Sequence, residues 1–106
     1  MLVVNRFRVP DDAAAAFRDD VTAALALLAA REGYLDGHIG RNVDEPELWV
    51  LSTRWVHVGA YRRALSSYDV KVGAVPLLSR ALDEPSAYET VTPGDALNIG
   101  STRSLG

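Results

Sequence analysis

Two tryptophans and a tyrosine stand close together in the sequence, where an alternating segment runs directly into an amphipathic one. Trp49 and Trp55 bound the alternating segment, and Tyr61 follows Trp55 by six residues. Their rings can hold a flat apolar molecule, and the indole N–H and phenol O–H can each donate a hydrogen bond. We therefore predict a binding pocket at this junction.

A further polar group, Asn5, stands in an apolar segment between Val3 and Phe7. Asparagine is a poor strand former, and a buried amide costs free energy unless it is hydrogen-bonded. Asn5, Trp55 and Tyr61 are therefore the main candidate site residues. Each also has a structural interpretation, because Asn5 can satisfy a bulge or a loop carbonyl and both aromatic rings can simply pack in the core.

Four other side chains are candidates for contact with a ligand. Phe7 shares a predicted strand face with Asn5, and Tyr68 lies near a predicted break in a helix. His38 is a possible base, although a lone histidine is more often a hydrogen-bonded structural group. The candidate substrate-binding residues are Phe7, His38, Trp49 and Tyr68.

Composition excludes several kinds of chemistry. The chain has no cysteine, which removes thiolate nucleophiles, disulfides and cysteine metal sites and is compatible with a reducing cytoplasm. No metal-ligand spacing, glycine-rich phosphate loop or nucleophile elbow is present, so we expect no metal and no bound cofactor. A net charge of −3 with mixed signs disfavours nucleic acid, and no apolar run is long enough to span a membrane.

The chain of 106 residues suits one domain, and its 48% hydrophobic content is enough for a core. We place a single domain at residues 1–92 and a Gly/Ser/Thr-rich tail at residues 93–106. The predicted elements are a strand at 2–9, a helix from Ala13 to near Gly33, strands at 34–42 and 47–55, a helical segment at 57–82 and a strand at 87–91. An aspartate of Asp11-Asp12 can accept hydrogen bonds from the first amides of the helix, and Gly37 and Gly40 in the second strand indicate a bulge or a close approach of backbone. Gly73 and Pro76 break the helical segment into two pieces, with Val72 among the residues predicted to be inside.

This order predicts an α+β fold, the ferredoxin-like βαββαβ sandwich with an antiparallel sheet. Two helices cover only one face of such a sheet. The other face would expose Leu2, Val4, Leu48 and Val50 to water, with Arg54 beside them to bind an anion or pair with an acid. A two-fold homodimer that pairs these faces is the simplest way to bury them.

Three short motifs resemble the antibiotic biosynthesis monooxygenase superfamily. They are Val3-Val4-Asn5-Arg6-Phe7, Glu32-Gly33-Tyr34-Leu35, and Trp49-Val50-Leu51-Ser52-Thr53-Arg54-Trp55 with Tyr61 beyond it. The resemblance covers roughly residues 1–92 and implies a dimeric α/β barrel with a pocket between sheet and helices in each subunit. Some members oxidise anthrones to quinones with molecular oxygen and no cofactor, and others degrade haem.

The haem-degrading branch is disfavoured by the residues at its ligand positions. Asn5 matches the asparagine of that branch, but the tryptophan position holds Ala64 and the histidine position falls near Val75. Neither side chain can ligate iron. The only imidazoles, His38 and His57, stand elsewhere in the sequence.

Two functions remain after this comparison. In the first, the resemblance implies a cofactor-free monooxygenase acting on an aromatic, polyketide-like substrate, with Asn5, Trp55 and Tyr61 as catalytic donors to the oxygen that becomes an enolate. In the second, the same scaffold is a non-catalytic homodimer that binds a small aromatic ligand. Likeness of fold cannot choose between them, because function depends on the site.

Overall fold

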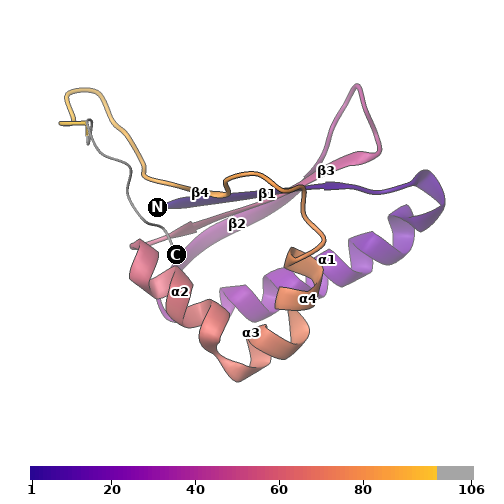
Figure 1. Cartoon of the computed structure of the whole chain (residues 1–106), viewed down its shortest axis with the longest axis horizontal. Helices are drawn as coiled ribbons and strands as arrows, with labels where there is room; N and C mark the ends of the chain where they lie inside the picture. Colours follow the sequence, from indigo (N-terminus) through magenta and orange to yellow (C-terminus); the bar gives the residue numbers. More distant parts are fainter. Residues whose placement is uncertain (98–106) are drawn as a thin grey trace.

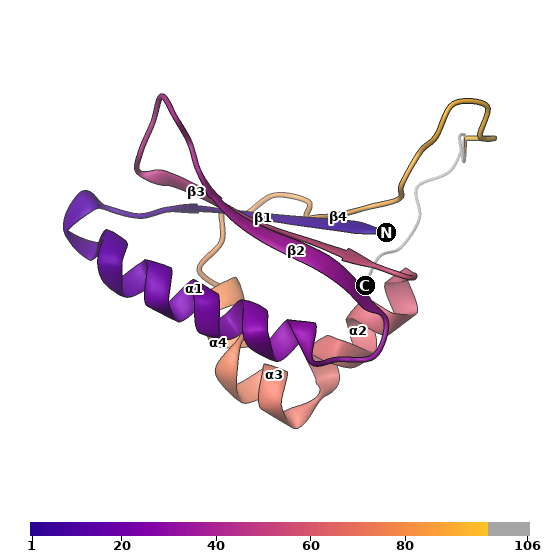
Figure 2. The same ribbon diagram turned by 180° about the vertical axis from the view of Figure 1, so that it is seen from behind.

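The computed structural model describes residues 1–97 and forms one antiparallel sheet covered by helices on a single face (Figure 1). Figure 2 shows the same two layers from behind, with the opposite face of the sheet uncovered. The sheet order is β2-β3-β1-β4. In chain order the elements are β1 (Leu2–Arg8), a 3-10 turn η1 (Asp11–Ala13), α1 (Ala14–Ala29), β2 (Tyr34–Arg41), β3 (Leu48–Trp55), α2 (Val58–Ser66), α3 (Tyr68–Gly73), α4 (Val75–Leu78) and β4 (Ala87–Tyr88).

The predicted ferredoxin-like fold is confirmed, including which side of each central strand faces the helices. On β3 the side chains alternate between buried and accessible, and on β1 Val3 and Phe7 are buried. Strands β1 and β3 pair so that Asn5 lies opposite Leu51 and Phe7 opposite Trp49. Both strands therefore present their apolar sides to the helices, because alternation places every second residue on the same face.

The helical segment after β3 differs from the prediction, because it has three helices rather than two. An additional break lies at Ser67, whose backbone is extended and ends α2. As a result Val72, which we predicted to be inside, is 59% exposed, while Val70 is fully buried. The change of direction at Ser67 rotates the apolar side of α3 relative to that of α2.

The start of α1 also differs from the prediction. We expected an aspartate to accept hydrogen bonds from the first amides, but neither η1 nor α1 has a side-chain cap. Instead the Asp11 carboxylate accepts from Arg41 at the end of β2, with an N–O distance of 3.1 Å. The aspartate therefore connects the turn to the sheet rather than capping the helix.

Strand β2 contains a bulge, but not at the glycines that suggested one. The irregularity lies between Tyr34 and Asp36, ahead of the glycines. Gly37 is instead a position of close approach, because a Cβ there would lie 2.7 Å from the Tyr34 hydroxyl and 2.8 Å from a methyl of Leu25. The close approach predicted for a glycine of this strand is therefore confirmed at Gly37, whereas the bulge lies elsewhere in the strand.

The uncovered face of the sheet has a mixed surface. Leu2, Val4, Leu48 and Val50 are half-buried there, and Arg54 pairs with Asp36 on the neighbouring strand, with Nε 3.0 Å from the carboxylate. Residues 93–97 are exposed, and the remainder of the predicted tail lies outside the described residues. None of the helices in residues 1–97 is long and apolar enough to cross a membrane.

Candidate functional site

Three aromatic rings meet where β3 ends, and we call Tyr34, Trp55 and Tyr61 the Trp55 cluster. The Tyr34 ring lies edge-on to Trp55 with a centroid separation of 5.5 Å, and the Tyr61 ring lies tilted on Trp55, also at 5.5 Å. Trp55 is fully buried between the two tyrosines. The predicted proximity of Trp55 and Tyr61 therefore exists, with Tyr34 as a third member.

The indole of Trp55 already has a hydrogen-bond partner. Its Nε1–H donates to the hydroxyl of Thr53 at 2.9 Å, and both groups are buried. This bond lies within one strand face, because the two residues are separated by a single outward-pointing residue. The N–H is consequently committed to the protein, and the part that Trp55 takes in the site is limited to supporting the Tyr61 ring.

The phenol of Tyr61 has no hydrogen-bond partner among the residues that the structure describes. Helix α2 presents it, and His57 caps that helix by accepting the Ala60 N–H at its Nδ1, 3.1 Å away. Burial raises the pKa of the Tyr61 phenol above its ordinary value. The hydroxyl therefore stays protonated at neutral pH, as a donor must.

A pocket of about 340 Å³ lies between α2 and the segment that leads into β4. Helix α2 forms one wall, with Tyr61 among its side chains, and the loop from Glu84 to Ala87 forms the other. The Glu84 carboxylate is held by Arg6, at 2.9 Å from Nε and 3.1 Å from Nη2. The lining residues are Val58, Tyr61, Arg62, Leu65, Glu84, Pro85, Ser86 and Ala87.

Asn5 lies on the strand that this loop follows. Its neighbours on the same face, Val3 and Phe7, are buried, but Asn5 itself is half-accessible, and its amide makes no hydrogen bond with any described residue. The Val4 N–H donates to the carbonyl of Ser86, and the Leu82 N–H donates to that of Arg6, so the intervening loop passes alongside Asn5. The side chain does not itself line the pocket of Tyr61.

Two predicted substrate-binding residues are not brought to this pocket. His38 pairs with Ser52 and is exposed on the uncovered face of the sheet, because the bulge in β2 sets which of its residues face the helices. Tyr68 begins α3 and is 78% exposed. With His57 engaged as a cap, neither imidazole of the chain lies between the sheet and the helices.

The other two, Phe7 and Trp49, lie in a second aromatic group, which we call the Trp49 cluster: Phe7, Phe17 and Trp49. The Phe17 ring is 5.1 Å from Phe7 and 5.3 Å from Trp49. All three rings are buried, and the Nε1–H of Trp49 has no hydrogen-bond partner among residues 1–97. This group is part of the core at the far end of β3.

Sequence reasoning did not find three components of the site. Thr53 could have been found, since it stands two residues before Trp55 on the same strand face. Tyr34 lies opposite Trp55 through the pairing of β2 with β3, and no local signal shows that register. The Glu84–Ala87 wall comes from a distant, irregular loop. No group of acidic or histidine side chains among residues 1–97 is arranged to hold a metal ion.

Comparison with known proteins gives one family and several solved structures. The antibiotic biosynthesis monooxygenase family matches residues 1–74. SnoaB, a cofactor-independent oxygenase from Streptomyces nogalater, is 25% identical with a TM-score of 0.71, covering 89% of this chain and 96% of its own. Rv0793 from Mycobacterium tuberculosis is 22% identical with a TM-score of 0.65, covering 90% and 95%.

A conserved protein from Methanosarcina mazei Go1 is also 22% identical, with a TM-score of 0.66, and the alignment covers 81% of this chain and 84% of that one. The two structures at 22% identity establish the shared fold. No curated protein matches the sequence.

Proposed function

Since this chain belongs to the antibiotic biosynthesis monooxygenase family, we propose that it is a cofactor-independent monooxygenase that oxidises an aromatic, anthrone-type substrate with molecular oxygen. The similarity to SnoaB, described as a cofactor-independent oxygenase, supports this choice. The sequence features that disfavour haem chemistry support it as well, because Ala64 is buried and Val75 is aliphatic.

The observation that carries the proposal is the free, protonated phenol of Tyr61 on the wall of the pocket. In this reaction the substrate loses a proton and becomes an enolate, whose electrons reduce O₂. One oxygen atom enters the ring as the quinone carbonyl, and the other leaves as water. A donor fixed on the pocket wall stabilises the enolate oxygen more than water does, because it needs no reorganisation as the charge develops.

The other two candidate residues have different parts in this proposal. Asn5 is a second donor for a substrate that extends beyond the pocket of Tyr61, because its amide does not line that pocket but is half-accessible on the helix-facing side and has no partner among the described residues. Trp55 acts as a positioning residue, because its N–H is bonded to Thr53 while its ring supports that of Tyr61. The pocket walls contributed by Val58, Leu65 and Pro85 suit a flat apolar molecule.

A homodimer belongs to the same proposal. The sheet face opposite the helices carries the apolar side chains of Leu2, Val4, Leu48 and Val50, which a second copy would cover. A two-fold interface is self-complementary, so the same face serves both subunits. The substrate pocket lies on the helical side and stays available in such a dimer.

Tyr61→Phe tests the proposal. The wild-type protein is expected to consume oxygen and form quinone from an anthrone above the buffer rate, and the variant to lose kcat on the order of tenfold or more. Tyr68→Phe is the matched control, since that hydroxyl is at an exposed position away from the pocket. Equal rates for wild type and Tyr61→Phe would remove the phenol from the mechanism.

One observation favours the non-catalytic alternative. Glu84 is the only carboxylate that lines the pocket, and it is held by Arg6, so no unpaired base faces Tyr61 among the described residues. A binding protein needs no base. Saturable quenching of tryptophan fluorescence by polycyclic phenols, without oxygen uptake on any of them, would establish ligand binding in place of oxidation.

A further inference from the structure

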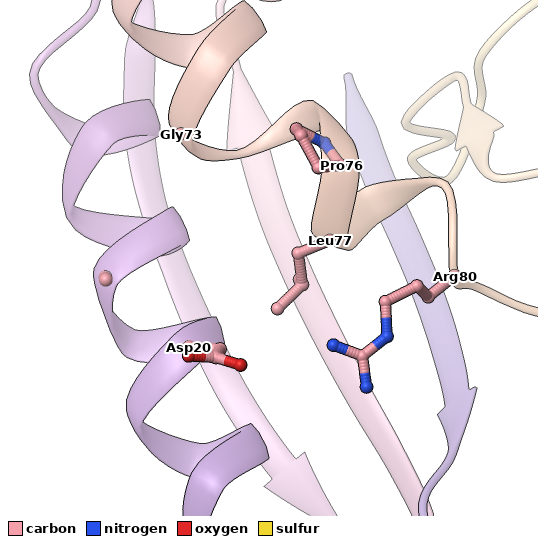
Figure 3. Close-up of a pocket in the computed structure, with 6 residues that line it drawn as sticks. Asp20, Gly73, Pro76, Leu77 and Arg80 are labelled. Carbon is pink, nitrogen blue, oxygen red and sulfur yellow. The ribbon is translucent and has the colours of Figure 1, made fainter.

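A separate pocket of about 290 Å³ lies between α1 and the end of the helical segment (Figure 3). It shares no residue with the pocket of Tyr61. In Figure 3 the side chains of Asp20, from α1, and Arg80, beyond α4, extend toward one another from opposite sides, with Leu77 between them. The lining residues are Asp20, Ala23, Gly73, Pro76, Leu77 and Arg80.

The two charges across this pocket are unpaired. Several arginines among residues 1–97 form ion pairs with carboxylates, for example Arg6 with Glu84 and Arg54 with Asp36. Arg80 has no carboxylate within 4.0 Å among the described residues, and Asp20 accepts no hydrogen bond. A carboxylate and a guanidinium cation therefore face the same space without forming an ion pair.

Arg80 is nevertheless held in place. Its guanidinium lies over the ring of Phe17, 5.6 Å from the centroid, and that ring is buried and in contact with Phe7 and Trp49. Stacking on an aromatic ring occupies the flat side of a guanidinium and leaves the N–H groups at its edge free to bind a carboxylate. Less side-chain entropy is then lost when a ligand binds.

The rest of the pocket wall is small or apolar. Gly73 contributes no side chain to it, and a Cβ there would press on a terminal methyl group of Leu27, which is free to move. Leu77 is 6% exposed and gives the pocket an apolar floor. A ligand with a short apolar body would therefore lie over Leu77 with its ends at Asp20 and Arg80.

We infer that this α1–α4 pocket binds a small zwitterion, with its ammonium group at Asp20 and its carboxylate at Arg80. A ligand with a single charge would leave either Asp20 or Arg80 without an opposite charge, whereas a zwitterion compensates both side chains. The inference is independent of the oxygenase proposal, because the two pockets are formed by different residues.

The test uses 4-(aminomethyl)benzoate as the zwitterionic probe, with benzoate and benzylamine as matched ligands of one charge. Titration of the full chain is followed by the amide signals of Ala23 and Leu77 in heteronuclear NMR. We expect saturation by the zwitterion with Kd in the range of roughly 0.1–5 mM, and at least fivefold weaker binding of either single-charge ligand.

Two variants localise the effect. Asp20→Asn and Arg80→Gln are each expected to weaken binding of the zwitterion about fivefold. Arg31→Gln, at an exposed position after α1, should leave the Kd unchanged. Thermal unfolding establishes that Arg80→Gln is still folded, and exposed Asp20→Asn tests the site without altering the core. Equal affinity for all three ligands, unsaturated shifts, or shifts confined to other residues would overturn the inference.

Discussion

The two tryptophans of β3 point to the same side of the sheet from the same strand, yet their surroundings differ. Trp55 has its N–H bonded to Thr53, lies between two tyrosines and supports a ring that lines a pocket. Trp49 has an N–H without a hydrogen-bond partner in the described part of the chain and lies against Phe17, with the Arg41 guanidinium 5.3 Å from its ring centroid.

This difference shows how two similar residues can acquire different roles. The Trp55 cluster combines rings that carry hydroxyl groups, so it remains polar where it reaches the pocket. No ring of the Trp49 cluster carries a hydroxyl group, and the guanidinium groups of Arg41 and Arg80 lie over Trp49 and Phe17. A strand pattern that marks both positions as aromatic does not distinguish a pocket wall from a core anchor.

The largest expected effect is a loss of stability when the hydrogen bond between Trp55 and Thr53 is removed. Trp55→Phe leaves the buried Thr53 hydroxyl without its partner, so we expect the free energy of unfolding to fall by about 1–3 kcal/mol. Urea denaturation measures this loss. The double variant Trp55→Phe with Thr53→Val removes both polar groups and should recover part of it; no recovery would show that ring packing, rather than the bond, accounts for the loss.

The second effect concerns activity next to the Trp55 cluster. Asn5→Ala should lower the rate of quinone formation on the order of tenfold, because it removes a donor to the enolate oxygen. Ser52→Ala, on the uncovered side of the neighbouring strand, is the control. A variant of unchanged rate but reduced stability would assign Asn5 a structural role.

A smaller effect is expected at the other tryptophan. Trp49→Phe removes an N–H that no described residue bonds and keeps an aromatic ring in contact with Phe17. The free energy of unfolding should therefore change by less than about 1 kcal/mol in either direction. Chemical denaturation of Trp49→Phe and Trp55→Phe under the same conditions compares the two losses directly. A loss as large as that of Trp55→Phe would contradict the contrast between the clusters.

The smallest effect lies outside both clusters, on the uncovered face. Hydrogen bonds from Arg54 hold the pKa of Asp36 below its ordinary value. The pair therefore adds stability above the pKa of the unfolded carboxyl, and this contribution disappears as pH falls through the lower, folded pKa. Asp36→Asn should be slightly less stable than wild type at pH 7, with the difference shrinking below about pH 4. A stability difference between wild type and Asp36→Asn that grows as pH falls would refute this assignment.

Much of the fold follows from local pattern. Alternation in Leu48–Trp55 identified β3 and both of its faces, because side chains of a strand point to opposite sides in turn. The spacing from Trp55 to Tyr61 likewise placed both rings at one corner, since β3 is followed at once by α2. The break at Ser67 had no such signal, and it turned Val72 outward where a continuous pattern had placed it inside.

The sequence by itself determined which residues are apolar or polar along each element, and therefore the order of elements and the buried side of the central strands. Only the tertiary structure decided that His38 faces away from the helices, that a loop at Glu84–Ala87 completes the pocket, and that Arg80 lies over Phe17. The reason is physical. Local periodicity depends on neighbours in the chain, whereas strand register, loop position and ring contacts depend on groups that only folding brings together.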